Sequence, residues 1–397
     1  MSPPSTMSTH LILTVGTGTA GKTSNLEAGL RRTLELISPA AFWLIPSTDE
    51  VSTLMADMVR DGQAAFRPWS ADTPYHSITA PDSLEICRRT VREVIQHVRK
   101  QLPRDARLLV NPTSGTKQMS AGATLAALDE GLGEIVFTVG QRADGVVMTG
   151  TERLEIFQAA GYFAERDLAI ARNLATAGAF AAAAAVLRPH PALAAQAGIA
   201  ACLHEWERQN YQDARRIAAG CDALAPWRRH LDALASAAKT PEPQPIVIAD
   251  LLQTADLLHR RGESDASLVQ SCRAVEMGLR RALFEKSGLA EPYALAAIRA
   301  LPIDREIKDR CAMVSHDGTR TILNLNTVAR ILQQLGHDIG SLFFADGGLQ
   351  GLIRVRNELM HSLRAATPAE SQAAVQRARN LLAPLHLPAA GARPTLT

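Results

Sequence analysis

The chain has 397 residues, of which 46% are apolar and only 4% are aromatic, and its formal net charge is +2. This length predicts two or three domains, and many alanines with few aromatic residues favour packed helices over an all-β fold. A net charge this close to zero excludes a global basic field, so any contact with nucleic acid must come from local clusters.

The five cysteines are scattered and odd in number, and no Cys-x-x-Cys pair occurs. Such a set indicates free thiols in a reducing cytoplasm rather than disulfides or a zinc site. No apolar run approaches the ~20 residues of a membrane span, and residues 1–9 lack the basic and apolar regions of a signal peptide. We therefore expect a cytoplasmic protein without a membrane span, with disordered tails at residues 1–9 and 388–397.

The first part of the chain alternates short apolar runs with helical patterns, as βαβ units do. Strands are expected at residues 10–15, 41–46, 64–69, 107–110, 134–139 and 146–149, the last pair as a hairpin through residues 143–145. Helices are expected at residues 24–37, 49–60, 81–101 and 118–130. Strands buried on both faces read as continuous apolar runs, as Leu-Ile-Leu-Thr-Val does here. The sequence therefore predicts an α/β, Rossmann-like domain with a parallel sheet over residues 10–152.

The strand signal disappears from about Arg153 onward. Three segments, beginning at Phe180, Tyr211 and Glu263, share alanine three residues later and an aliphatic residue six later. This spacing suits helical hairpins packed through small residues, but three loose matches do not establish a repeat family. Alternating prolines at residues 241–245 mark a linker, because they cannot continue a helix. We expect an all-α connecting region at 153–240 and an all-α domain at 246–387.

A glycine-rich segment at residues 16–23 matches the P-loop pattern G-x-x-x-x-G-K-[ST] between a strand and a helix. In that setting backbone N–H groups and the lysine hold phosphates. However, the strands that run into Pro46 and Asn111 do not end in the Asp that a P-loop enzyme uses to hold Mg²⁺. We favour a turn that contacts a ligand's phosphates without hydrolysing NTP, with these candidate residues: Gly16, Thr17, Gly18 and Lys22.

A second polar turn follows the strand at 107–110 and opens a helix, so that free N–H groups and the helix dipole face one point. In open α/β sheets ligands bind beyond the carboxyl ends of the strands, so the turns after Val15, Pro46 and Val110 should share that edge. The alternative is that Thr113 or Ser114 merely caps the helix. The turn has more polar groups than a cap requires, and the candidate ligand-binding residues are Thr113, Ser114, Gly115, Thr116 and Lys117.

Residues 351–363 predict an amphipathic helix that carries Arg356, Asn357 and His361. A cation, an amide and an imidazole can cut a phosphodiester without metal. Asn357 and His361 lie i, i+4 on one face, whereas Arg356 lies roughly 140° around the helix and must bend back to join them. Other Arg-to-His pairs of similar spacing occur in the chain, so spacing alone decides nothing. A solvated helix face stays open as the alternative.

Residues 111–122 and 356–361, with this order of domains, resemble the CRISPR-associated CARF–HEPN ribonucleases of type III systems. The resemblance implies a homodimer whose CARF domains bind cyclic oligoadenylate, an allosteric activator, with no metal or other cofactor. It implies that the HEPN domains pair into a composite endoribonuclease site for single-stranded RNA in antiviral defence. The resemblance also implies catalytic roles for Arg356, Asn357 and His361, and ligand-binding roles for residues 113–117.

The chemistry that the resemblance implies is coherent, because RNA carries its own nucleophile in the 2′-OH. Imidazole titrates near neutral pH, so His361 can move protons, while the forked donors of Arg356 can stabilise phosphate charge. The expected products end in 2′,3′-cyclic phosphate. Two alternatives remain, which are a P-loop-type NTPase with a helical output domain and a non-enzymatic nucleotide sensor.

Overall fold

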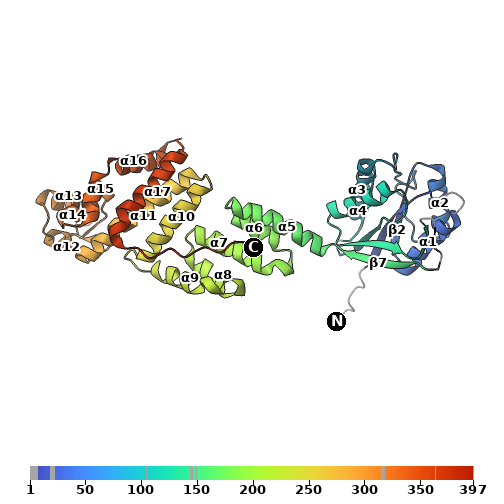
Figure 1. The fold of residues 1–397 in the computed structure, drawn as a ribbon, viewed down its shortest axis with the longest axis horizontal. Coiled ribbons are helices and arrows are strands. Elements are labelled where there is room, and N and C mark those ends of the chain that lie inside the picture. Colours follow the sequence, from blue (N-terminus) through green and yellow to red (C-terminus); the bar gives the residue numbers. More distant parts are fainter. Residues whose placement is uncertain are drawn as a thin grey trace. The chain divides into compact units, whose positions relative to one another are not determined.

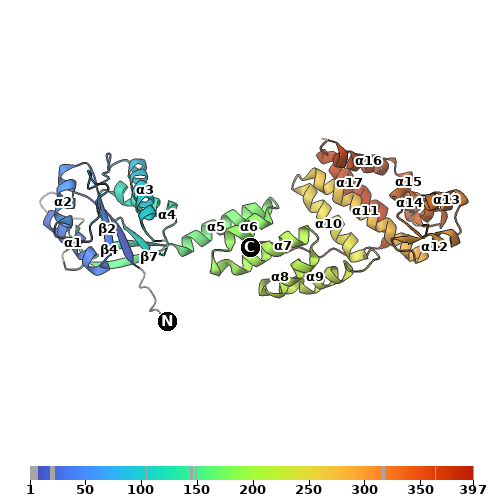
Figure 2. The same ribbon diagram turned by 180° about the vertical axis from the view of Figure 1, so that it is seen from behind.

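The computed structural model describes residues 8–17, 23–103, 105–143, 146–148, 150–313, 318–362 and 364–396. They form two compact units, Met1–Phe163 and Ala164–Thr397 (Figures 1 and 2). Within the described ranges, none of the helices combines the length and the apolar character that a bilayer span requires. A separate boundary at the prolines of residues 241–245 stays a prediction.

The first unit is built on a five-stranded sheet of order β2-β1-β3-β4-β7. Its parallel strands are β1 (Thr9–Val15), β2 (Ala41–Pro46), β3 (Arg107–Asn111) and β4 (Glu134–Val139). Its helices are α1 (Thr23–Ile37), α2 (Glu50–Arg60), α3 (Leu84–Gln101) and α4 (Lys117–Asp129). The predicted Rossmann-like α/β fold is confirmed.

Both faces of this sheet are covered, which explains the continuous apolar runs of its strands. Alternate side chains of β1, such as Leu11 and Leu13, pack with α1 and α2, whereas Ile12 packs with α3 and α4. Figures 1 and 2 show these two helix pairs on opposite sides of the strands. The sheet is therefore doubly wound.

Three expectations for this unit are wrong. Residues 64–69 make only one bridge, between Phe66 and Phe42, because Pro68 has no N–H to continue the pairing. Residues 146–148 do not pair with β4, and Thr149 lies outside the described residues. Instead β6 (Val146–Val147) pairs with β5 (Arg142–Ala143), and β4 pairs antiparallel with β7 (Arg153–Gln158). The sequence hides β7 because it is an edge strand whose side chains are mostly exposed.

The second unit is helical. The helices at its amino-terminal side are α5 (Ala160–Thr176), which begins in the first unit, α6 (Phe180–Leu187), α7 (Ala194–Glu207), α8 (Tyr211–Ala219) and α9 (Ala225–Ala237). Short 3₁₀ turns, η1 (Pro191–Leu193) and η2 (Asp222–Leu224), precede α7 and α9. Next come α10 (Pro245–Arg260) and α11 (Ser264–Ser287), which begins the third predicted hairpin segment.

The three hairpin segments begin with the same turn. Gly178, Gln209 and Gly262 have φ of +77°, +60° and +81°, and each stands two residues before the first residue of α6, α8 or α11. The register predicted for the third segment is wrong by one residue. Buried Ser264 takes the place that Phe180 has in α6, while Glu263 only precedes the helix.

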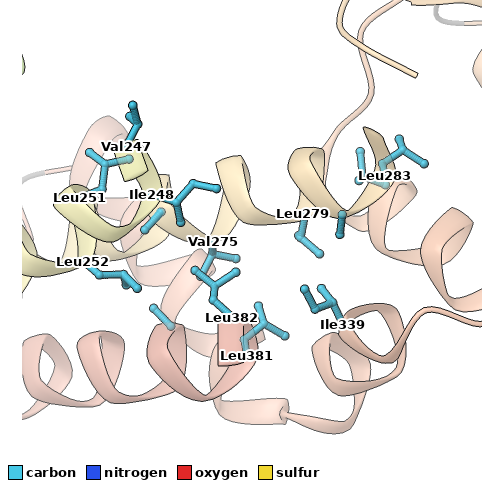
Figure 3. Close-up of a cluster of buried hydrophobic side chains, with 14 of the residues drawn as sticks. Val247, Ile248, Leu251, Leu252, Val275, Leu279, Leu283, Ile339, Leu381 and Leu382 are labelled. Atoms are coloured by element: carbon cyan, nitrogen blue, oxygen red, sulfur yellow. The ribbon is translucent and has the colours of Figure 1, made fainter. Parts of the chain in front are cut away.

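The remaining helices complete the carboxyl-terminal half of this unit. They are α12 (Leu295–Ala300), α13 (Arg305–Met313), α14 (Leu325–Gln334), α15 (Asp338–Ala345), α16 (Gly347–His361), α17 (Pro368–Leu382) and η3 (Ala383–Leu385). A two-residue ladder between β8 (Tyr293–Ala294) and β9 (Arg320–Thr321) interrupts the helical pattern. Figure 3 shows leucine, isoleucine and valine side chains of α10, α11, α15 and α17 meeting in one core.

Helix α11 is the centre of that core. Its Val275, Leu279 and Leu283 are no more than 1% exposed. A Cβ on Gly278 would lie 2.1 Å from a methyl carbon of Leu382, so a larger residue would force that side chain to move. This packing fixes α11 as the support on which α16 and α17 rest.

The last residues are ordered by contacts, so the expectation of a disordered tail at 388–397 is wrong for the described residues up to 396. The Arg393 guanidinium lies over the Trp206 ring at 5.1 Å and donates to Thr254 at 2.6 Å. It also pairs with Asp250, which is 1% exposed, at 3.5 Å. Arg393 thus anchors a segment whose composition predicts a disordered tail.

Candidate functional site

A cavity of about 1020 Å³ opens in the first unit beside the carboxyl ends of β1 and β3. The chain passes from β1 to β2 on one side and reaches β3 on the other, so these ends form a topological switch point. Ligands of open α/β sheets bind at such points. The cavity walls include six of the predicted ligand-binding residues, which are Thr17, Thr113, Ser114, Gly115, Thr116 and Lys117.

Hydrogen bonds from three neighbouring strands hold the turn after β3. Thr14 of β1 donates to the Ser114 carbonyl at 2.5 Å. The Asn111 side chain of β3 accepts from the Thr113 N–H at 3.0 Å, and the Thr113 hydroxyl accepts from the Thr138 N–H of β4 at 2.8 Å. The turn is therefore shaped before any ligand arrives, and Thr113 has a structural role besides any role in binding.

Gly16 and Gly115 bring the turns after β1 and β3 into direct backbone contact. The Gly16 N–H donates to the Ser114 hydroxyl at 3.0 Å. A Cβ on Gly16 would lie 2.5 Å from the Gly115 Cα, and Gly115 itself has φ +117°. Both glycines are thus required by the geometry. Gly18 and Lys22 lie outside the described residues.

Helix α4 begins at this turn with an exposed lysine. The Thr116 side chain caps the helix by accepting from the Met119 N–H at 3.1 Å, so the cap that the sequence left open is Thr116 rather than Thr113 or Ser114. Lys117 follows as the first helical residue and forms no ion pair with any described residue. A helix N-terminus and a free lysine at one cavity wall attract anionic groups.

The turn after β2 lies at the same sheet edge, as expected, but it does not line the cavity. Ser52 connects it to β1 by donating to the Val15 carbonyl at 2.8 Å and accepting from the Ser47 N–H at 2.9 Å. The sequence analysis missed the cavity residues contributed by other elements, which are Asn25, Leu26, Gly29, Leu30, Thr33, Ser120, Ala121, Thr124, Leu125, Thr138, Val147 and Glu152. Of these, Ser120 and Ala121 lie in the segment 111–122 that carries the resemblance, and the others have no local motif because the fold alone assembles them.

The second candidate site lies on α16 in the helical unit. Leu352 and Val355 pack its inner face against Leu268 and Cys272 of α11. Arg377 of α17 pairs with Asp346, which caps the amino end of α16. The helix is thus anchored through its apolar face and its first turn.

The three predicted catalytic residues lie in different environments along this helix. Arg356 is half-buried, and its guanidinium contacts the Cys272 thiol of α11. Burial raises the pKa of Cys272 to about 11, although the charge and hydrogen bond of Arg356 oppose that rise. Asn357 and His361 are exposed, and His361 is the last helical residue. The structure places Asn357 and His361 on the solvent side, whereas Arg356 points toward α11.

The chain just beyond His361 is held by charged groups. Arg364 pairs with Glu358 of α16 and with Glu370 in the first turn of α17. Glu370 also forms a capping box with Thr367 at the start of α17. Among the described residues, no group of three His, Cys, Asp or Glu side chains is placed to hold a metal ion.

No protein-family profile and no curated protein sequence matches this chain. Among solved structures, its fold is similar to that of Enterococcus italicus Csm6 bound to cyclic hexa-2′-fluoro-hexa-dAMP. The sequence identity is 11% and the TM-score is 0.53, over 96% of this chain and 94% of the Csm6 chain. The likeness establishes a shared fold along nearly the whole chain, an α/β unit followed by a helical one.

Proposed function

We propose that this chain is a CARF–HEPN ribonuclease of a type III CRISPR system, in which cyclic oligoadenylate activates cleavage of single-stranded RNA. The protein acts as a homodimer in the cytoplasm, in defence against viral RNA, and needs no metal or further cofactor. The observation that carries the proposal is the cavity at the β1/β3 switch point, lined by residues 113–117, in a chain that shares the Csm6 fold.

The cavity suits a ligand with several phosphates and several bases. The N-terminus of α4 and Lys117 supply an anion-binding wall. Leu26, Leu30 and Leu125 supply apolar surface on the other walls, against which a base can pack. The Csm6 structure of the same fold holds a cyclic hexanucleotide of adenine. A cyclic oligoadenylate combines these two kinds of groups in one molecule.

In this proposal the catalytic side chains lie on α16. In cleavage the 2′-oxygen attacks the adjacent phosphorus, the bond to the 5′-oxygen breaks, and the products carry a 2′,3′-cyclic phosphate and a 5′-hydroxyl. His361 moves the protons, Arg356 stabilises the phosphorane charge, and Asn357 orients the histidine or the phosphate. One chain offers only a single set on an exposed helix end, so a two-fold axis that pairs two sets completes the site.

The test is an RNase assay of the purified chain with cyclic tetraadenylate, cyclic hexaadenylate, ATP or no nucleotide. We expect cleavage only with a cyclic oligoadenylate, unaffected by EDTA, and no cleavage of a substrate that is 2′-deoxy at the cut site. ATP hydrolysis that requires Lys22 would instead identify an NTPase. Tight binding of the ring without any RNA cleavage would identify a non-enzymatic sensor.

A further inference from the structure

A buried carboxylate joins four segments of the helical unit. Asp250 of α10 is 1% exposed. Its Oδ1 accepts from the Trp206 indole N–H of α7 at 2.9 Å, and its Oδ2 accepts from the Tyr211 hydroxyl of α8 at 2.9 Å. The fourth segment is the end of the chain, from which the Arg393 guanidinium supplies a positive charge at 3.5 Å. This carboxylate therefore connects α7, α8 and α10 with a segment that follows α17.

The Arg393 side chain occupies a socket formed by Trp206, Asp250 and Thr254. The side chain is only 8% exposed, and its guanidinium lies over the Trp206 ring. It donates to the Thr254 hydroxyl, which in turn donates to the Asp250 backbone carbonyl at 2.8 Å. Within the described part of the chain, no other cationic side chain pairs with Asp250. Because a buried charge is costly without its partner, each member of this pair depends on the other.

Backbone groups just before this arginine are held from two helices. The Gly391 carbonyl accepts from the Gln253 side-chain amide of α10 at 3.0 Å. The Ala392 carbonyl accepts from the Trp227 indole N–H of α9 at 2.6 Å. Figures 1 and 2 show this end of the chain beside α7, whose Trp206 contacts it. The last described residues therefore lie across α7, α9 and α10, and we call residues 388–396 the carboxyl-terminal strap.

The strap is a second connection between two parts of the helical unit. Along the chain, the hairpin helices α5–α9 reach α10–α17 through residues 238–244. A cavity of about 290 Å³ lies between this connection and α11, so close packing does not hold the whole connection. The two parts also share an apolar core, but apolar contacts are non-directional. The socket around Arg393, by contrast, pairs its charges in one arrangement of the two parts.

We propose that the strap fixes the hairpin helices and the carboxyl-terminal half as one body through the Asp250–Arg393 pair, and that activation of cleavage requires this fixation. In chain order, α5–α9 stand between the α/β unit and α16, so a change caused by the activator has to pass through them. If the two parts could move against each other, that movement would absorb the change. The requirement for activation rests on the proposed function, whereas the fixation does not.

The experiment compares full-length Arg393→Gln, Asp250→Asn and the double variant by thermal melting and amide hydrogen exchange. Each single variant leaves one charge buried without its partner, so it should melt about 5–15 °C below wild type. The double variant buries neither charge and should recover most of this loss. Exchange in the single variants should rise in α7, α9 and the strap, but not in the sheet of the α/β unit. The control is Arg229→Gln, which changes an exposed arginine of α9 and should behave like wild type.

Activity below the melting temperature separates fixation from a general defect in folding. Arg393→Gln should bind the cyclic oligoadenylate as tightly as wild type, because the ligand cavity belongs to the other unit, whereas activated cleavage should fall by about tenfold or more. If Arg393→Gln melts and exchanges like Arg229→Gln, the strap fixes nothing and the inference is overturned. A less stable Arg393→Gln protein with full activated cleavage would overturn the requirement for activation. If the wild type shows no activated cleavage, the proposed function fails together with that requirement, while melting and exchange still decide the fixation.

Discussion

In the α/β unit, hydrogen bonds from β1, β3 and β4 hold the turn after β3, and backbone contact with Gly16 supports it. On α16, by contrast, only Arg356 of the three candidate groups packs against the protein, while Asn357 and His361 project into solvent. One chain therefore holds a preformed pocket in its α/β unit, whereas two of the three candidate groups on α16 lack packing partners. If the proposed cleavage occurs, it would depend on groups that a second copy adds, while the pocket needs only the folded unit.

The largest effect is expected for His361→Ala. His361 is the proton-transfer group of the proposed site, so its removal should lower activated RNA cleavage by about 10²-fold or more. Binding of the activator should be unchanged, because His361 belongs to the helical unit. Gel assays of RNA cleavage and calorimetry of activator binding measure the two quantities on the same preparation.

The control for His361→Ala is His386→Asn, which changes another exposed histidine of the same unit. Asparagine tolerates the left-handed conformation of this position, where φ is +46°. Mixed dimers of wild-type and His361→Ala chains should lose most of their activity if the site is composite. If a His361→Ala protein is as active as wild type, α16 has no catalytic role and its outer face is only a solvated surface.

Arg356→Ala should also abolish cleavage. The variant is informative because Arg356 is the one candidate catalytic residue on α16 that packs against the rest of the protein. Arg354 is an exposed arginine two residues earlier on the same helix, so Arg354→Ala is the matched control. We expect normal cleavage in Arg354→Ala and a loss of about 10²-fold in Arg356→Ala, as for removal of one charge-stabilising donor. Equal activity of the two variants would assign Arg356 to packing against Cys272 alone.

Lys117→Ala tests whether the preformed cavity of the α/β unit binds the activator. The loss of a charged phosphate contact should weaken activator binding by about 1.5–3 kcal/mol, which is roughly 10- to 150-fold, without affecting the fold. The control is Lys100→Ala, which removes an exposed lysine of α3 in the same unit. Calorimetry showing unchanged affinity in Lys117→Ala would remove this lysine from the site.

The sequence predicts those parts of the site that are local in the chain. The turn at residues 113–117 and the helix with Arg356 can be found because strand, polar turn and helix follow one another directly. Cavity residues such as Asn25 and Thr138 could not be found in this way, because only the fold brings them to the same cavity as this turn. The contact of Arg356 with Cys272 likewise depends on how α16 packs on α11.

The errors in the fold have the same origin. Edge strand β7 has too few buried side chains to give a periodic signal, and the real partner of β4 was therefore missed. The segment around Arg393 has the composition of a tail, but Asp250 and Trp206 are held in place by distant helices and bind it. Composition and periodicity cannot show contacts that only the folded chain creates.

Gly16→Ala should give the smallest effect on activity and the clearest effect on pocket geometry. A methyl group at this position would overlap the Gly115 Cα, at 2.5 Å, so one of the two turns must shift. We expect a loss of about 1–3 kcal/mol in stability, since backbone cannot move aside as a side chain can. Gly133→Ala is the matched control, because a Cβ there meets no atom within 4 Å. Thermal melting should separate the two variants, and activator binding should weaken only in Gly16→Ala. If Gly16→Ala melts and binds like Gly133→Ala, the close contact of the two turns does not shape the pocket, and the contrast between a preformed sensor site and an incomplete cutting site loses its structural basis.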